Sequence, residues 1–259
     1  MKKVAILQAR LDSSRLPRKV LAPLAGRPVI AHILDRLQTS RELDGICVAV
    51  PEVASEDELV ALLRLRGVTI VRGPETNVLT RYTIAAYETG AEIIVRATAD
   101  NPLVDIGVMD EQVRYLAEHP EADYVYTRDL PLGVSTETFT HKTLDKLDFL
   151  ARTPLLREHV TYYLRQNPAP FNVVCLAPPP ELAHPQLRLT LDTPADLKLF
   201  EALYEELYAG GGIVSTREAV SLLLARPELA QLNHHEVQVP SLTPLAPQAT
   251  ERERPEVRR

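Results

Sequence analysis

The sequence opens with Met1-Lys-Lys-Val-Ala-Ile-Leu-Gln-Ala-Arg-Leu-Asp-Ser-Ser-Arg-Leu-Pro-Arg-Lys-Val20, in which a short apolar run leads into a basic loop. Val4–Leu7 has the length and composition of a buried strand. The loop carries four cations, two hydroxyls and a stiff Leu-Pro step: Arg10, Arg15, Arg18, Lys19, Ser13, Ser14 and Leu16-Pro17. Ligands bind at strand ends in open α/β sheets, and both Arg and Lys suit phosphate. The stretch therefore predicts an anion site, with a solvated surface loop as the alternative.

Similar apolar runs recur along the chain and alternate with amphipathic segments. The predicted strands are Val4–Leu7, Ile46–Val50, Val68–Val71, Ile93–Arg96, Tyr124–Thr127, Phe171–Leu176 and Leu187–Leu191. The predicted helices are Pro28–Leu37, Asn77–Glu88, Ile106–Glu118, Thr153–Leu164, Pro194–Tyr208 and Ser215–Leu224. A further helix is predicted to open with a capping box at Ser55–Glu58 and to run to about Arg66. Such alternation is typical of an α/β fold with a doubly wound, mostly parallel sheet and helices on both faces.

Length and composition indicate one folded domain followed by a tail. The chain has 259 residues, 45% hydrophobic and 25% charged, which is enough to bury a sizeable core. We expect a single domain over residues 1–239. Residues 240–259 are rich in Pro and charge, so we expect them to be disordered.

The two cysteines, Cys47 and Cys175, fit neither a disulfide framework nor a metal site, and no signal peptide is evident. A cytoplasmic location is therefore expected.

The charge balance limits the classes of partner that the chain is expected to bind. The formal net charge is −6 and the pI is about 5.7, so one basic loop in an acidic chain favours a small anion over a nucleic acid. No apolar stretch reaches the length of a membrane span, so no membrane partner is expected. The loop also matches neither the Walker A motif nor the Rossmann glycine pattern, which disfavours ATPase and dehydrogenase functions.

Two carboxylates follow later predicted strands. Asp100 ends the run Ile93-Ile-Val-Arg-Ala-Thr-Ala-Asp-Asn-Pro102, and Asp192 ends Leu187-Arg-Leu-Thr-Leu-Asp192. Mg²⁺ is usually held by one or two carboxylates together with substrate phosphates. A magnesium site shared by Asp100 and Asp192 is one interpretation. A simple turn at Asp100 and a helix N-cap at Asp192 are the alternatives.

At this point the sequence resembles a known family. The motifs that carry the resemblance are Ala9-Arg10-Leu-Asp-Ser13-Ser14-Arg15-Leu16-Pro17-Arg-Lys19, Arg72-Gly73 with Val78-Leu79-Thr-Arg81-Tyr82, Val95-Arg96-Ala-Thr98-Ala-Asp100-Asn-Pro102-Leu103, Gly133 with Glu137-Thr-Phe139, Arg157-Glu158-His159-Val160-Thr161 and Arg188-Leu-Thr-Leu-Asp192-Thr-Pro-Ala-Asp196. In this order they are similar to the acylneuraminate cytidylyltransferase superfamily of nucleotide-diphospho-sugar transferases, in the branch that includes spore-coat polysaccharide biosynthesis protein F.

The resemblance implies a Rossmann-like nucleotidyltransferase that transfers a nucleoside monophosphate, commonly from CTP, to a sugar or sugar acid and releases pyrophosphate. It implies catalytic roles for Arg10, Lys19 and Asp100, and Mg²⁺ bound by Asp100 and Asp192. The implied nucleotide-binding residues are Ala9, Arg10, Ser13, Ser14, Arg15, Lys19, Arg72, Arg96 and Thr98. For Arg72 and Arg96, a salt bridge at a helix or strand end is an equal alternative. The implied acceptor-side residues are Arg81, Gly133, Glu137, Glu158 and His159. For His159, a packed and hydrogen-bonded ring is favoured over a catalytic base. The oligomeric state is left open, with a homodimer as the candidate.

The chain also departs from the family pattern. Arg18 replaces a usual Gly, Asn77 replaces a usual Asp, and Pro131–Phe139 lacks two usual acids near the acceptor. The base and the acceptor are therefore not fixed by the sequence. Two alternatives remain, namely a glycosyltransferase that uses a nucleotide sugar and a non-catalytic nucleotide-binding protein.

Overall fold

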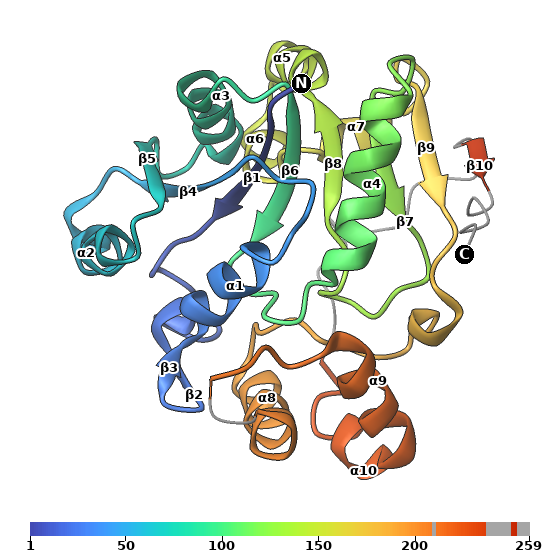
Figure 1. The fold of residues 1–259 in the computed structure, drawn as a ribbon. Coiled ribbons are helices and arrows are strands. Elements are labelled where there is room, and N and C mark those ends of the chain that lie inside the picture. Colours follow the sequence, from blue (N-terminus) through green and yellow to red (C-terminus); the bar gives the residue numbers. More distant parts are fainter. Residues whose placement is uncertain (209–210, 237–249, 253–259) are drawn as a thin grey trace.

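An eight-stranded sheet forms the centre of the molecule (Figure 1). The computed structural model describes residues 1–208, 211–236 and 250–252. The strand order in the sheet is β10-β9-β7-β8-β6-β1-β4-β5, and among these strands only β8 runs antiparallel to its neighbours. The strands are β1 (Lys3–Gln8), β4 (Gly45–Pro51), β5 (Thr69–Gly73), β6 (Ile93–Thr98), β7 (Tyr124–Thr127), β8 (Glu137–Thr140), β9 (Val173–Leu176) and β10 (Thr250–Arg252). The expected mostly parallel α/β sheet is confirmed.

Helices cover both faces of this sheet, as expected for a doubly wound fold. They are α1 (Val29–Leu37), α2 (Asp57–Leu65), α3 (Val78–Thr89), α4 (Ile106–Glu118), α5 (His141–Leu150), α6 (Pro154–Glu158), α7 (Tyr162–Gln166), α8 (Pro194–Leu207), α9 (Thr216–Ala225) and α10 (Pro227–Ala230). Short 3₁₀ turns η1 (Lys19–Leu21), η2 (Ala54–Glu56) and η3 (Pro180–Leu182) and a small hairpin of β2 (Pro23–Leu24) and β3 (Arg27–Pro28) complete the described elements. No described helix is both long and apolar enough to cross a bilayer.

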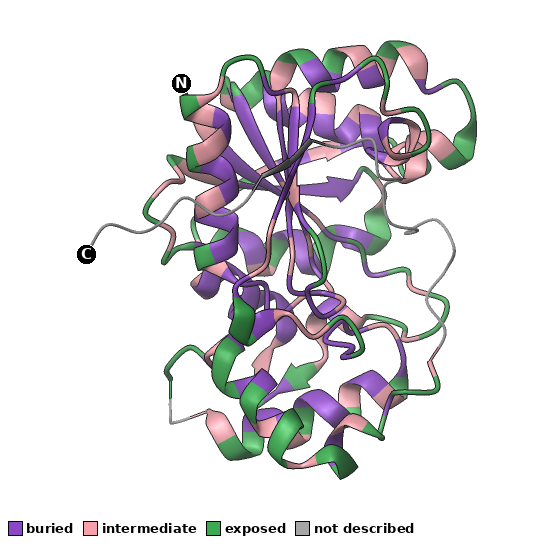
Figure 2. Cartoon of the chain, turned by 90° about the vertical axis from the view of Figure 1, so that its right-hand side faces the viewer, coloured by how far each residue is buried: buried purple, intermediate pink, exposed green. Residues whose placement is uncertain are grey.

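The side-chain alternation of the strands divides the core into two layers. In β1, Ala5 and Leu7 pack in one apolar cluster with α1, α4 and α8, whereas Val4 and Ile6 pack in the other with α3 and α5. All four side chains are buried, and Figure 2 shows the buried strands between the helical layers. The continuous apolar runs recognised in the sequence reflect this burial on both faces.

The strand order reverses beside β1. The chain moves from β1 to β4 and β5 on one side, and returns to β6 on the other. Ligands in such sheets bind outside the carboxyl ends of the strands at this switch point. Here the switch point holds the loop after β1 and the turn after β6, which are the segments that carry the basic loop and Asp100.

Several local predictions were wrong. The expected strand Leu187–Leu191 is not part of the sheet; its alternate leucines are buried, but it pairs with loops, with a single parallel bridge between Leu132 and Arg188. The expected helix Thr153–Leu164 is split into α6 and α7, because Val160 between them has a φ of 37°. The capping box at Ser55–Glu58 does not form; α2 begins at Asp57 without a side-chain cap.

The sequence analysis also missed β8, which is short and polar, and α5, whose buried face consists of Thr143, Leu144 and Leu147. Most of the predicted disordered tail at 240–259 lies outside the described residues. Thr250–Arg252 departs from that prediction by pairing with β9, because an edge strand offers unpaired backbone groups.

Candidate functional site

The carboxyl ends of β1 and β6 open into a cavity of about 890 Å³. Its lining contains every predicted site residue except Arg72. Those residues are Ala9, Arg10, Ser13, Ser14, Arg15, Lys19, Arg81, Arg96, Thr98, Asp100, Gly133, Glu137, Glu158, His159 and Asp192. Segments far apart in the sequence, from Ala9 to Asp192, therefore meet at one place.

The basic loop after β1 is held in shape by its own backbone and by one buried carboxylate. Arg18 N donates to Leu11 O at 3.0 Å and closes the loop, and Leu11 is buried in the core. Glu56, which is 1% exposed, accepts from Leu11 N at 2.9 Å. Glu56 thereby ties η2 to the basic loop. Arg18 has a φ of 59°, the left-handed region that favours Gly, which agrees with the Gly usual in the family.

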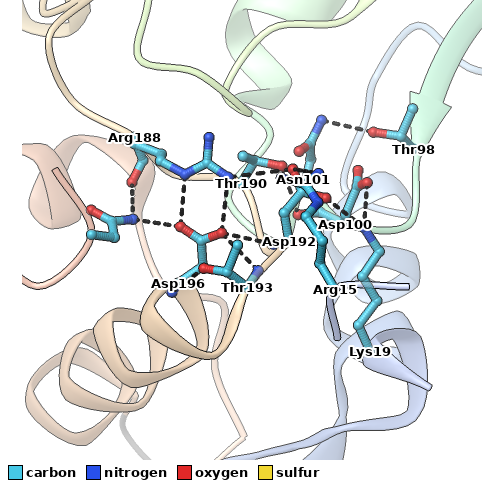
Figure 3. Close-up of polar contacts among 11 residues, drawn as sticks. Arg15, Lys19, Thr98, Asp100, Asn101, Arg188, Thr190, Asp192, Thr193 and Asp196 are labelled. Atoms are coloured by element: carbon cyan, nitrogen blue, oxygen red, sulfur yellow. Dashed lines mark hydrogen bonds and ion pairs between the residues drawn. The ribbon is translucent and has the colours of Figure 1, made fainter. Parts of the chain in front are cut away.

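Lys19 lies between the two predicted metal ligands (Figure 3). Its Nζ donates to Asp100 Oδ2 at 2.8 Å and to Asp192 Oδ1 at 2.7 Å. The two carboxylates therefore converge on one point, although they lie far apart in the sequence. Burial lowers the pKa of the Lys19 ammonium, but attraction to Asp100 and Asp192 outweighs burial and leaves the pKa above its ordinary value. Burial raises the pKa of Asp100, and attraction to Lys19 outweighs it, so that pKa is lowered.

Backbone contacts bring the two aspartate segments together. Leu191 N donates to Asp100 O at 2.7 Å, which joins the residue before Asp192 directly to Asp100. Leu189 N donates a further hydrogen bond to Leu132 O at 2.7 Å, in the neighbouring loop. Gly133, with a φ of 92°, makes this approach possible, since a Cβ there would lie 2.6 Å from Leu189 C and 2.8 Å from Thr190 N. Gly133 thus has a backbone role in placing Asp192.

A buried ion pair supports Asp192 from behind. Arg188 Nε and Nη2 donate to Asp196 at 2.8 and 2.9 Å, and Asp196 is fully buried. Asp196 Oδ2 also accepts from Asp192 N at 2.9 Å, and Asn233 Nδ2 donates to Asp196 Oδ1 at 2.8 Å. Thr193, and not Asp192, caps α8, in a capping box with Asp196. The N-cap alternative for Asp192 is therefore wrong, and its carboxylate points to Lys19 instead.

A second charged cluster builds the opposite wall of the cavity. Glu137 on β8 accepts from Arg96 Nη1 at 2.7 Å, Tyr124 Oη at 2.5 Å, Thr161 Oγ1 at 2.8 Å and Arg165 Nη1 at 3.1 Å. Burial raises the pKa of Glu137, but attraction to Arg96 and Arg165 outweighs it and lowers the pKa to about 2. Protein donors thus surround this carboxylate on both oxygens.

The other predicted residues differ in how open they are. Arg10 is half-exposed and lies 3.7 Å from Glu158 Oε1, and Arg15 lies 3.1 Å from Asp192 Oδ2. His159 faces the cavity and meets Tyr162 edge-on, and its ring forms no hydrogen bond with the described residues. Burial lowers the pKa of that ring.

Arg81 and Arg72 are held by backbone carbonyls. Arg81 is 2% exposed and its Nη1 donates to Pro74 O at 2.5 Å and to Glu75 O at 2.8 Å. Arg72 does not reach the cavity; it donates to Asp57 Oδ1 at 2.8 Å and to Val53 O at 2.6 Å. These bonds fasten the end of β5 to the residues on either side of η2, so Arg72 forms the salt bridge that was the alternative to a nucleotide contact.

Comparison with known proteins identifies the family. The family model described as "Cytidylyltransferase" matches residues 4–218. The chain belongs to the cytidylyltransferase family. A curated relative, "Spore coat polysaccharide biosynthesis protein SpsF" of Bacillus subtilis, is 32% identical over 87% of this chain and 95% of the relative. "Uncharacterized protein MJ1063" of Methanocaldococcus jannaschii is 38% identical over 90% of this chain and 95% of its own length. A solved cytidylyltransferase from Leptospira borgpetersenii superposes with a TM-score of 0.82 at 27% identity, covering 92% of this chain and 99% of that one.

The residue set of this cytidylyltransferase fits a divalent cation. Asp100 and Asp192 offer hard carboxylate oxygens, and both already surround one cation, the Lys19 ammonium. The described residues hold no group of three or more His, Cys, Asp or Glu side chains suited to a metal. The remaining ligands would therefore have to come from water and phosphate, which is how Mg²⁺ is usually bound beside nucleotides.

Sequence reasoning missed the residues that support this cytidylyltransferase site. Arg188 and Asp196 stand in the same motif as Asp192, and the Thr193-x-x-Asp196 capping box was a readable signal. Tyr124, Thr161 and Arg165 gave no such signal, because their contact with Glu137 depends on how β7, β8 and α7 pack.

Proposed function

We propose that this cytidylyltransferase transfers CMP from CTP to a hydroxyl group of a sugar or sugar acid, with release of pyrophosphate and with Mg²⁺ as cofactor. The observation that carries the proposal is the convergence of the basic loop, Asp100 and Asp192 in one cavity at the switch point of the sheet. Phosphoryl-type transfer needs positioning and charge stabilisation more than covalent chemistry, and these are what the cavity offers.

The loop after β1 supplies the triphosphate contacts in this proposal. Arg10 and Arg15 are half-exposed cations at the cavity, and Ser13 and Ser14 add hydroxyl groups beside them. Their mobile, solvent-accessible side chains favour binding of the β- and γ-phosphates, so that pyrophosphate is stabilised as it leaves. On β6, Arg96 and Thr98 line the same cavity and are the nucleotide-side candidates. Arg72 is not among them.

Asp100 and Asp192 would hold Mg²⁺, which neutralises phosphate charge when it is bound. Thr98 Oγ1 accepts from Asn101 Nδ2 at 2.8 Å and steadies the turn that presents Asp100. Arg188 and Asp196 steady Asp192 in the same way. These side chains keep both ligands directed at one point before any substrate arrives.

The acceptor is expected against the wall formed by β7, β8 and α7. Arg128 and Arg165 lie on this wall beside Asp129 and Glu137, so it offers both donors and acceptors to the hydroxyl and carboxylate groups of a sugar acid. His159 faces the same space, and burial lowers the pKa of its ring, which favours the neutral form that accepts the proton of an attacking hydroxyl.

A role in surface polysaccharide synthesis is part of the proposal, because the Bacillus subtilis relative is named for spore-coat polysaccharide biosynthesis. We expect the enzyme to act in the cytoplasm, where its two buried thiols, Cys47 and Cys175, stay reduced. A homodimer stays a prediction.

The experiment is a pyrophosphate-release assay. Each of the four nucleoside triphosphates is supplied with Mg²⁺ and a panel of neutral sugars and sugar acids, and UDP- and GDP-sugars are tested in parallel. We expect release with CTP and a sugar acid. Turnover of a nucleotide sugar without any release from CTP would instead identify a glycosyltransferase and refute the proposal.

A further inference from the structure

The ammonium of Lys19 lies at the point that a shared metal would need. It contacts Asp100 Oδ2 at 2.8 Å and Asp192 Oδ1 at 2.7 Å, and its side chain is only 13% exposed. A divalent cation that joins the two aspartates has to bind these same carboxylates. Lys19 and the metal therefore compete for one position.

Lys19 also relieves a repulsion that would otherwise oppose the site. Two carboxylates that converge on one point repel each other unless a cation lies between them. Arg15 and Arg188 approach the other oxygen of Asp192, at 3.1 and 3.4 Å, but neither is recorded in contact with Asp100. Among the described contacts, Lys19 is the cation that bridges the pair.

Phosphate gives Lys19 another partner nearby. Arg10, Ser13 and Ser14 line the same cavity as Lys19. A lysine is a compact charge on a flexible stem, so a small rotation exchanges one anion for another without moving η1. Lys19 thus shares one cavity with the two carboxylates and with the loop that is proposed to bind phosphate.

From this geometry we propose that Lys19 is an exchangeable counter-ion: it holds Asp100 and Asp192 together, is displaced from them by the divalent cation, and then binds the triphosphate. The proposal rests on the proposed function and adds that binding of the nucleotide and binding of the metal are coupled. Since the nucleotide provides the displaced ammonium with a new partner, nucleotide and metal each strengthen binding of the other. Metal binding without nucleotide is correspondingly weak.

The test is a titration of Mn²⁺ monitored by the electron paramagnetic resonance signal of the free ion, with and without a non-reactive α,β-methylene analogue of CTP. Lys19→Met removes the charge and keeps most of the stem. We expect it to bind Mn²⁺ alone at least tenfold more tightly than the parent, and the strengthening of Mn²⁺ binding by the analogue to fall at least tenfold.

Two control variants separate charge from packing. Lys19→Arg keeps a cation and is expected to bind Mn²⁺ alone as weakly as the parent. Lys142→Met removes an exposed lysine of α5 and should change neither titration. If Lys19→Met binds Mn²⁺ alone as weakly as the parent, or more weakly, the exchange does not occur. The titration uses no acceptor, so its result is independent of whether the parent turns over CTP; loss of CTP turnover in the parent would refute the proposed function and leave the exchange standing.

Discussion

Gly133→Ala tests how closely the fold and the metal site depend on each other. A Cβ at this position would lie 2.6 Å from Leu189 C and 2.8 Å from Thr190 N, and closer still to the Leu189 carbonyl oxygen. All three atoms belong to backbone, so no flexible side chain can yield. The segment that must move is the one that carries Asp192.

The expected loss of stability in Gly133→Ala has two sources. A side chain at a φ of 92° is strained by about 1–3 kcal/mol, and overpacking against backbone adds about 1–3 kcal/mol. We therefore expect the free energy of unfolding to fall by roughly 2–6 kcal/mol, which lowers the melting temperature by about 4–24 °C in a chain of this size. Turnover should fall by about 10²-fold, since a displacement near 1 Å in a catalytic group has that effect.

Gly90→Ala is the matched control for the strain alone. Gly90 has a φ of 65° at the end of α3, and a Cβ there meets nothing within 4 Å. This change should cost only about 1 kcal/mol and leave turnover unaltered. Urea unfolding and CTP turnover are measured for both variants. If Gly133→Ala is as stable and as active as Gly90→Ala, the close approach at Leu189–Thr190 does not position Asp192.

Three further predictions concern the cavity wall, the two arginines and the tail. The pKa of Glu137 is lowered from 4.5 to about 2, so the contribution of this carboxylate to the free energy of unfolding is complete above pH 4.5 and is lost as the pH falls toward 2. Urea unfolding of the parent should show a decrease of about 3 kcal/mol over this range, and the decrease should be smaller in Glu137→Gln. Arg10→Ala should lower turnover by about 10²–10³-fold with little change in melting temperature, whereas Arg72→Ala should lower the melting temperature and spare turnover; the opposite pattern would exchange their roles. Deleting residues 240–259 removes the pairing of β10 with β9 and should leave turnover unchanged with a stability change below about 1 kcal/mol; a truncated chain that fails to fold would contradict this.

Much of the fold could be predicted from the sequence because burial on both faces leaves a clear signal. Continuous apolar runs marked β1, β4 and β6, and helix starts such as Pro28 and Asn77 marked the segments between them. β8 gave no such run, because Glu137 and two threonines occupy most of its four residues. The split between α6 and α7 could not be predicted either, because a positive φ is rare for a β-branched residue and nothing in the sequence indicates the φ of 37° at the buried Val160.

The site was predictable where its residues follow strands. Asp100 lies just beyond the carboxyl end of β6, and Lys19 ends the basic loop that follows β1, so the order of the strands predicted that these two segments meet. Asp192 was assigned to the site by the same reasoning, although the extended segment before it pairs with a loop and is not part of the sheet. The contacts of Glu137 and Asp196 could not be predicted in this way, because they join side chains from elements whose packing the sequence does not reveal.

The central claim is that Asp100 and Asp192 share one catalytic divalent cation. The most direct test is the Mg²⁺ dependence of CMP transfer for Asp100→Asn and Asp192→Asn, with Asp129→Asn as a control that removes another carboxylate from the cavity lining. We predict that both substitutions raise the half-saturating Mg²⁺ concentration at least tenfold and that the control does not. A normal Mg²⁺ dependence in Asp192→Asn, beside a weakened one in Asp100→Asn, would contradict the account, because one carboxylate alone would then bind the metal.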